Sequence, residues 1–339
     1  MRLENIARRA FGLGGGGAAM NDLVSEPVPR LSRPRIGLAL GGGAARGWAH
    51  IGVLDVLTEA GYAPEVIAGT SIGAVVGGCY AADKLEQLRE FALGLTKRRV
   101  VGLMDFHLGG AGLISGGRLK RLLERDLAGL QISDLKQTYA AVATELGTGH
   151  EIWLTRGSLV DALRASYALP GVFDPVKLGG RWLMDGALVN PVPVTVARAL
   201  GADVVLCVNL NSDMTGRGTV IQSYGADPDP EPTPEQRPAT GWFGSVRERM
   251  RGIVDKANHE QQPGLAGVMI DAFNITQDRI SRSRLAGDPP DVMIGPRLGR
   301  VGLFDFHRAD EAIALGRQAA ERALDEIAAI VAANHLPLN

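Results

Sequence analysis

A serine between two glycines, in Gly69-Thr70-Ser71-Ile72-Gly73, is the segment of this sequence best suited to chemistry. It follows the apolar residues 66–68 and precedes residues 74–81, a run of small and apolar residues with helical character. A serine on a tight strand-to-helix turn has its hydroxyl exposed above the sheet, and flanking residues without bulk relieve the close approach of strand and helix. The spacing therefore predicts a nucleophile elbow in which Gly69 and Gly73 flank the nucleophile Ser71.

A triple glycine, Gly41-Gly42-Gly43, follows the first apolar run and leads into Ala44-Ala45-Arg46-Gly47. A main chain without side chains can approach a ligand closely, and amides at the start of a helix stabilise an anion. Arg46 is unusual there, because a cation at a helix N-terminus opposes the helix dipole. A bound anion and an ion pair with a nearby carboxylate are the two explanations that we consider.

Glycine loops after a first strand also bind nucleotides, so that function has to be weighed. A P-loop ends in Gly-Lys followed by Ser or Thr, whereas this loop ends in Ala-Arg-Gly-Trp. A dinucleotide loop counted from Gly41 would place its third glycine at Arg46, and the second strand would end in an acid rather than at Ser71. We therefore expect no bound nucleotide.

The third feature is an acid in Asp185-Gly186-Ala187, at the end of an expected hairpin. Asp-Gly is also a common turn dipeptide, so Asp185 alone is weak evidence. A serine nucleophile needs a base, which is usually a histidine. None of the six histidines has the surroundings of a base, and His259 or His307 as the third member of a triad stays an alternative.

Together, residues 38–47, the elbow and Asp185-Gly186-Ala187 resemble the three signature motifs of patatin-like phospholipases, and residues 166–173 are similar to a further segment of that family. The resemblance covers about residues 34 to 310 and is nearest to the bacterial branch related to neuropathy target esterase. It implies an α/β fold of three layers, with a mostly parallel central sheet covered by helices. It also implies a Ser-Asp dyad without a catalytic histidine, and lipid acyl esters as substrates.

Carried over to this sequence, the resemblance makes Ser71 the nucleophile and Asp185 the base. It assigns oxyanion and substrate binding to Gly41, Gly42, Gly43, Arg46 and Ile72. Plant members have a shorter glycine-arginine spacing, so which amides form the oxyanion hole stays open. We expect hydrolysis of phospholipids or lysophospholipids through an acyl-enzyme, with neither metal nor cofactor. The alternatives are a non-catalytic regulatory or scaffold protein with this fold, and a Ser-Asp-His α/β-hydrolase.

The elements that must position these residues alternate between strand and helix. Strands are expected at residues 35–40, 65–69, 140–145, 151–155, 203–209 and 291–294, and helices at 48–57, 74–81, 119–127, 158–168, 192–200 and 309–332. A hairpin with a Gly179-Gly180 turn is expected over 173–184, and Asn190-Pro191 predicts the N-cap and first residue of the next helix. This order is typical of a parallel sheet with covering helices.

Composition sets further limits. A chain of 339 residues that is 45% hydrophobic can bury a large core, and a net charge of −1 gives no sign of nucleic acid as a partner. Cys79 and Cys207 lie in apolar runs, which predicts buried small residues of a reducing compartment. No uncharged apolar stretch reaches the roughly 18 residues of a membrane-spanning helix.

We expect a flexible N-terminal extension over residues 1–33 and a single domain over 34–339, with a mobile insertion near 211–238. Arg8-Arg9 resembles an export signal, but the following residues are mostly glycine and alanine, so a cytoplasmic location is expected. Residues 242–256 alternate apolar and basic side chains at helical spacing. This pattern indicates either peripheral contact with the anionic inner membrane surface or a helix packed on the core.

Overall fold

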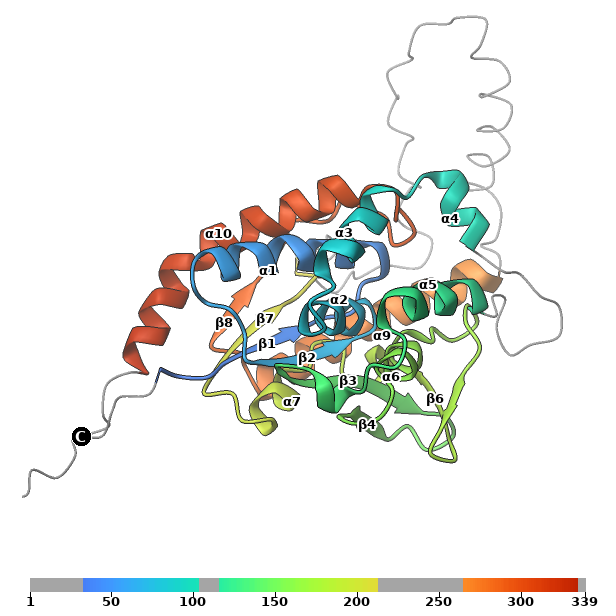
Figure 1. Cartoon of the computed structure of the whole chain (residues 1–339), viewed down its shortest axis with the longest axis horizontal. Coiled ribbons are helices and arrows are strands. Elements are labelled where there is room, and N and C mark those ends of the chain that lie inside the picture. The colour runs from blue at the N-terminus through green and yellow to red at the C-terminus, as the bar shows by residue number, and fades with distance from the viewer. Residues whose placement is uncertain (1–32, 104–115, 213–264, 335–339) are drawn as a thin grey trace, which may run out of the picture.

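The computed structural model describes residues 33–103, 116–212 and 265–334 (Figure 1). The predictions for residues 1–32, for 213–238 of the insertion and for 242–256 therefore lie outside the described part of the chain. The centre of the described part is one mixed sheet of eight strands. These are β1 (Ile36–Leu40), β2 (Val66–Thr70), β3 (Thr138–Glu145), β4 (Glu151–Leu154), β5 (Val176–Leu178), β6 (Arg181–Asp185), β7 (Val204–Val208) and β8 (Val292–Ile294).

The order of the strands is β5-β6-β3-β2-β1-β7-β8, with β4 also paired to β3. Strands β1, β2, β3, β7 and β8 run parallel, whereas β4 and β6 run antiparallel to β3, and β5 runs antiparallel to β6. The chain moves from β1 through β2 to β3, and β7 is added later on the other side of β1. Open α/β sheets bind ligands beyond the carboxyl ends of the strands, where the strand order reverses. The loops after β1 and β2 lie at this position.

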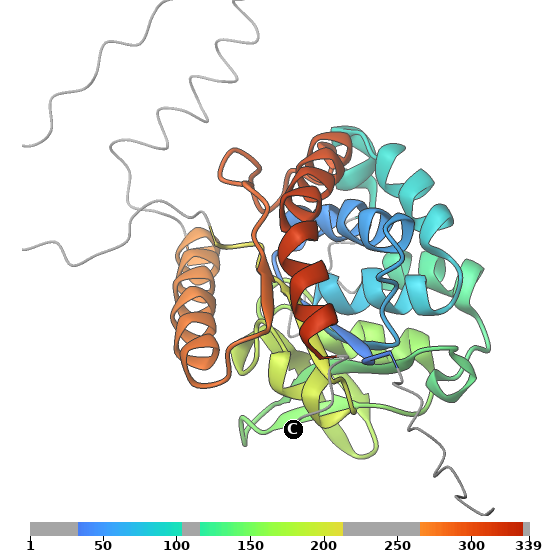
Figure 2. The same ribbon diagram turned by 90° about the vertical axis from the view of Figure 1, so that its left-hand side faces the viewer.

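Helices cover both faces of the sheet, because side chains alternate between the two faces along each strand. One face carries α1 (Ala49–Glu59), α2 (Ile72–Ala81), α3 (Leu85–Leu93), α5 (Gly117–Leu127), α6 (Leu159–Tyr167) and α10 (Ala309–Ala333). The other face carries α7 (Val194–Ala199) and α9 (Leu265–Gly287), and α4 (Lys97–Leu103) follows α3. Figure 2 shows α9 on the opposite side of the sheet from α1 and α10. The three-layer α/β fold with a mostly parallel sheet is confirmed.

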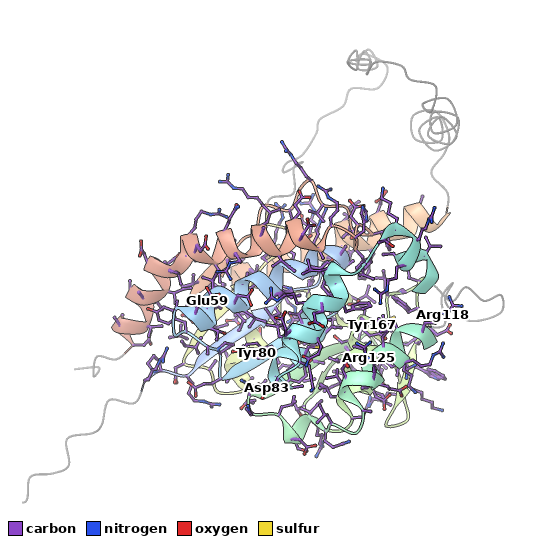
Figure 3. The ribbon with its side chains drawn as sticks, turned by 45° about the horizontal axis from the view of Figure 1, so that its top comes forward. Glu59, Tyr80, Asp83, Arg118, Arg125 and Tyr167 are labelled. Carbon is purple, nitrogen blue, oxygen red and sulfur yellow. The ribbon has the colours of Figure 1, made fainter. Side chains whose placement is uncertain are left out.

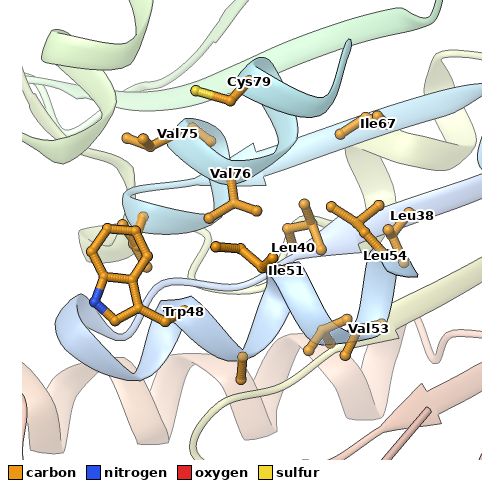
Figure 4. Close-up of a cluster of buried hydrophobic side chains, with 14 of the residues drawn as sticks. Leu38, Leu40, Trp48, Ile51, Val53, Leu54, Ile67, Val75, Val76 and Cys79 are labelled. Carbon is orange, nitrogen blue, oxygen red and sulfur yellow. The ribbon is translucent and has the colours of Figure 1, made fainter. Parts of the chain in front are cut away.

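The larger core lies between the sheet and α1 and α2 (Figure 4). Ile51 and Leu54 of α1 lie there beside Leu40 and Leu38 of β1, and Trp48 belongs to the same cluster. Helix α1 is apolar on nearly every side, since α10 covers the face that the sheet does not. The two helices cross closely: a Cβ on the glycine at position 52 or at position 316 would lie within 2.1 Å of a main-chain oxygen of the other helix. This contact holds the start of α1, and with it the glycine loop, against the body of the protein.

Most of the expected elements are confirmed, with ends shifted by a few residues. The Asn190-Pro191 prediction is wrong, because α7 begins at Val194 and Pro193 occupies its N-cap position. A residue before proline is disfavoured in the helical region, so the helix starts after Pro193 rather than before it. Helices α3, α4 and α9 were not predicted from the sequence.

Both cysteines are buried free thiols, as expected from their apolar surroundings. Across the described ranges, the helices are too short or too polar to cross a lipid bilayer.

Candidate active site

Ser71 lies on a tight turn between the end of β2 and the start of α2, with φ 57° and ψ −124°. A positive φ is uncommon for a residue with a side chain and costs conformational energy that the surrounding structure must offset. A Cβ on Gly69 would lie 2.5 Å from Cα of Ala74, and one on Gly73 would lie 2.2 Å from the carbonyl oxygen of Leu40. Both flanking positions therefore require glycine, for the reason that the sequence pattern suggested.

The hydroxyl of Ser71 donates a hydrogen bond to Oδ2 of Asp185 at 2.6 Å. The sheet brings these residues together, although they are 114 positions apart. Thr70, which precedes Ser71, pairs with Val142 of β3, and Asp185 pairs with the next residue of that strand, Ala143. Neighbouring positions on one strand thus hold Ser71 and Asp185 side by side.

The carboxyl group of Asp185 is almost fully buried, with 1% of the residue exposed. Its Oδ1 accepts a hydrogen bond from the amide of Ala187 at 2.9 Å, and its main-chain carbonyl accepts one from the hydroxyl of Thr144. Burial raises the pKa of Asp185 to about 7, against the opposing effect of the hydrogen bonds from Ser71 and Ala187. A carboxylate with a pKa near the working pH is a more effective general base than one at its ordinary value.

Two buried hydroxyl groups hold the elbow in place. Oγ of Ser166 accepts a hydrogen bond from the amide of Ser71 at 2.9 Å and donates one to the carbonyl of Val142 at 2.6 Å. The hydroxyl of Thr70 donates to the carbonyl of Asn190 at 2.8 Å. The sequence alone did not predict a role for the hydroxyl of Ser166 or of Thr70. The signal for Ser166 was its place at the start of the further segment 166–173.

The first two amides of the glycine loop already have partners. The amide of Gly41 donates to the carbonyl of Val208 at 3.1 Å, and that of Gly42 donates to the carbonyl of Pro191 at 3.0 Å. These bonds fix the loop to the end of β7 and to the segment before α7. Neither amide is therefore available to a ligand. Of the glycines expected to bind the oxyanion, Gly41 and Gly42 cannot do so through their main-chain N–H groups.

The next two amides, of Gly43 and Ala44, make no hydrogen bond with the described part of the chain. Both residues line the same pocket as Ser71, and so does Ile72, whose amide opens α2. Unpaired amides at the start of helices are the groups with which proteins bind anions. Gly43, Ala44 and Ile72 are therefore the main-chain candidates for stabilising an oxyanion.

Hydrogen bonds of the Arg46 and His50 side chains hold the glycine loop in place. Nε of Arg46 donates to the carbonyl of Val301 at 2.8 Å, and Nη1 donates to the side-chain oxygen of Asn211 at 3.2 Å. Nε2 of His50 lies 2.8 Å from the carbonyl of Gly41, and burial lowers the pKa of His50 to about 4, so the neutral ring donates this bond. Arg46, expected in the oxyanion region, is absent from the described lining of the pocket. Its contacts favour a positioning role.

A Ser-Asp-His triad would need His259 or His307 as its histidine. His259 lies outside the described part of the chain, and His307 is not among the described residues that line the pocket. The one hydrogen bond of the Ser71 hydroxyl within the described residues is with Asp185.

A cavity of about 220 Å³ extends from Ser71 and Asp185 between α2, α3 and α5. Ile72, Val75 and Cys79 line it along α2, with other apolar side chains around them: Trp48, Leu88, Phe91, Leu95, Val100, Leu119, Leu122, Leu123, Leu127, Tyr167, Leu169, Val172, Phe173, Phe273, Leu303, Phe304 and Phe306. Its polar and charged lining includes Lys84, Gln87, Arg125 and Asp126, at the start of α3 and the end of α5. Figure 3 labels Tyr167 and Arg125. Such a cavity suits a long apolar chain whose polar end reaches Ser71.

The chain is similar in sequence to several known proteins. Residues 38–198 match the family described as patatin-like phospholipase. An uncharacterized NTE family protein of Mycobacterium tuberculosis is 35% identical over 87% of this chain and 92% of its own length. A second one from the same organism is 32% identical over 87% of this chain and 47% of its own length. Patatin-like phospholipase domain-containing protein 6 of Mus musculus is 34% identical over 56% of this chain and 14% of its own length.

Proposed function

This chain belongs to the patatin-like phospholipase family, and we propose that it is a serine hydrolase that cleaves acyl esters of phospholipids or lysophospholipids. The observation that carries the proposal is the 2.6 Å hydrogen bond from the Ser71 hydroxyl to the buried carboxyl of Asp185, at one end of an apolar cavity. A fatty acyl chain fits such a cavity, because burial of its methylene groups stabilises the bound state by about 0.8 kcal/mol each.

The proposed reaction has two steps. Oγ of Ser71 attacks the ester carbonyl carbon while its proton moves to Oδ2 of Asp185, and the carbonyl oxygen becomes an oxyanion near the amides of Gly43 and Ala44. The ester bond then breaks, and the leaving alcohol takes the proton from Asp185. In the second step water attacks the acyl-enzyme and gives its proton to Asp185, and Ser71 recovers a proton as the fatty acid leaves.

The raised pKa of Asp185 makes this proton transfer less costly. The pKa gap between Asp185, at about 7, and an alcohol, near the roughly 15.7 of water, corresponds to about 12 kcal/mol for transfer before attack. With an ordinary carboxyl the cost would be about 4 kcal/mol greater. Transfer must still accompany bond formation, and each preorganised donor to the oxyanion contributes roughly 2.7–4 kcal/mol. The loop amides are thus as necessary as the base.

A non-catalytic scaffold protein with this fold is the alternative to a hydrolase. A scaffold would not need a nucleophile paired with a carboxyl group whose pKa burial raises to about 7. Strongly shifted pKa values and strained main-chain conformations gather at active sites. Ser71 has the strained main-chain conformation and Asp185 has the shifted pKa, which together support an enzyme.

A lipid-class panel tests the proposal. Purified protein is incubated with phospholipids and lysophospholipids of different head groups and acyl lengths, and released fatty acid is measured. Vesicles containing anionic lipid are included, because peripheral membrane contact is one of the two explanations for the basic amphipathic pattern of residues 242–256, the other being a helix packed on the core. We expect hydrolysis by the wild type and none by Ser71→Ala. Equal release by both proteins, or no reaction of the wild type with a fluorophosphonate probe, would refute the proposal.

A further inference from the structure

Gln277 presents a buried side-chain amide to the candidate site from an element outside the matched family region. It lies on α9, 4% of it is exposed, and it lines the same cavity as Ser71 and Asp185. Its side chain makes no hydrogen bond with any residue that the structure describes. The amide is not among the described polar atoms that are both sealed from solvent and without a partner, so it opens into the cavity, where a bound group can accept its N–H.

The amide and the nucleophile lie on the same side of the glycine loop. A Cβ built on Gly42 would lie 3.6 Å from Nε2 of Gln277 and 3.5 Å from Cβ of Ser71. Residues 43 and 44, which carry the unpaired loop amides, follow directly in the chain and line the same cavity. The side-chain N–H of Gln277 thus lies close to both the glycine loop and Ser71.

Helix α9 is anchored in this position. Arg284, two turns after Gln277, donates to Oε2 of Glu151 at 2.7 Å, and the other oxygen of that carboxylate accepts a hydrogen bond from the side chain of Asn190. The helix also packs against residues 186–188, which follow the catalytic carboxyl in the chain. A donor held by a fixed helix costs little reorganisation when charge develops near it.

We propose that Gln277 donates its side-chain N–H to the oxyanion that forms when Ser71 attacks an ester, as a third donor beside the loop amides of Gly43 and Ala44. This inference rests on the proposed hydrolase function and deepens it, since it adds a residue that touches the reacting atoms. The oxyanion would be the hydrogen-bond partner that the amide lacks among the described residues.

The test compares Gln277→Leu and Gln277→Glu with the wild type. Leucine has no donor, and glutamate keeps the shape of the side chain but has no donor when ionised. Gln318→Leu, the same change on the exposed side of α10, is the matched control. The substrates are nitrophenyl esters, and the inhibitor is an alkyl trifluoromethyl ketone. Ser71 adds to the ketone carbon, its proton moves to Asp185, and the ketone oxygen becomes an oxyanion.

Both Gln277 variants are expected to lose roughly 10²-fold in kcat at about pH 8, the loss typical of one oxyanion donor, with little change in KM. Inhibition by the ketone weakens by a similar factor, whereas the melting temperature of Gln277→Leu changes little, because the amide has no hydrogen bond to lose within the described residues. Gln318→Leu keeps the kinetics of the wild type.

The outcomes separate this inference from the function on which it rests. A wild type that neither hydrolyses the esters nor reacts with a fluorophosphonate refutes the hydrolase, and this inference with it. An active wild type whose Gln277 variants keep kcat and ketone affinity refutes the role of Gln277 alone. A rise in KM with unchanged kcat also refutes it, because the amide would then bind substrate and transition state equally. If Gln277→Leu fails to fold, Gln277→Glu decides the question.

Discussion

The main-chain amide of Ser71 donates a hydrogen bond to the hydroxyl of Ser166 at 2.9 Å, and that hydroxyl in turn donates to the carbonyl of Val142 at 2.6 Å. One buried hydroxyl thus joins the strained elbow to the neighbouring strand. It satisfies an amide that the positive φ of Ser71 turns away from the regular ladder, and so helps to hold the Ser71 side chain toward Asp185.

Ser166→Ala should therefore affect both stability and catalysis. It leaves a buried amide and a buried carbonyl without their partner, which lowers the free energy of unfolding by about 1–3 kcal/mol. The freed elbow misplaces Ser71, so we expect a loss of roughly tenfold or more in kcat. Denaturant unfolding and ester kinetics measure the two effects. Ser133→Ala, at an exposed serine, is the control, and a Ser166→Ala protein as stable and active as that control would contradict the role of Ser166.

The pH dependence of kcat/KM on a nitrophenyl ester should follow the ionisation of Asp185. The carboxyl must be ionised to accept the proton of Ser71, and its pKa is raised to about 7. Activity therefore rises with pH and levels off above about 7. His50, whose pKa is lowered to about 4, stays neutral over this range and adds no second step. A profile that is flat, or that falls, between about pH 5.5 and 8.5 would contradict Asp185 as the base.

Asp185→Asn should be inactive yet more stable than the wild type at high pH. The carboxyl titrates near 3.8 in the unfolded chain and near 7 in the folded one, so the folded state holds the proton more tightly. The resulting stabilisation is complete below the unfolded pKa and is lost as the pH rises through about 7. Asparagine does not ionise, so its advantage in unfolding free energy should grow by roughly 2–3 kcal/mol from about pH 5 to pH 8. An advantage that stays constant or shrinks would contradict the raised pKa.

Cys79 should limit the length of the acyl chain. It lines the cavity on α2, about 12 Å along the helix from Ser71 at 1.5 Å per residue, a distance that an extended chain covers in roughly ten bonds. Cys79→Phe fills this level of the cavity. We expect kcat/KM for esters longer than about ten carbons to fall roughly tenfold or more relative to the butyrate ester, since overfilling a packed site costs about 1–3 kcal/mol. An unchanged ratio of long to short esters in the variant would place the acyl chain elsewhere.

Local features of the site could be predicted from the sequence because a few adjacent residues determine them. The elbow needs glycine on both sides of Ser71, and the sequence provides it within five positions. The partnership of Ser71 and Asp185 came from the resemblance to a family, because 114 residues separate them and spacing alone does not pair them. The fold class followed from the alternation of apolar runs with helical and extended character.

Contacts between distant segments could not be predicted in this way. The carbonyls that occupy the amides of Gly41 and Gly42 belong to residues 208 and 191, so the sequence of the loop alone does not tell which of its amides are unpaired. Helix α9 was missed because two residues of its buried face, Gln277 and Ser281, are polar. A helix with such a face has no apolar stripe at helical spacing in its sequence. The role that we propose for Gln277 depends on this helix.

The proposed reaction depends on acylation of Ser71, which mass spectrometry of the intact protein detects. Wild-type protein is mixed with a slowly released acyl nitrophenyl ester, stopped with acid and digested for peptide mapping. We expect one added acyl group, located on the peptide that contains Ser71 and missing from Ser71→Ala. An ester that is hydrolysed at the wild-type rate by Ser71→Ala, or an acyl group found on a different residue, would contradict it.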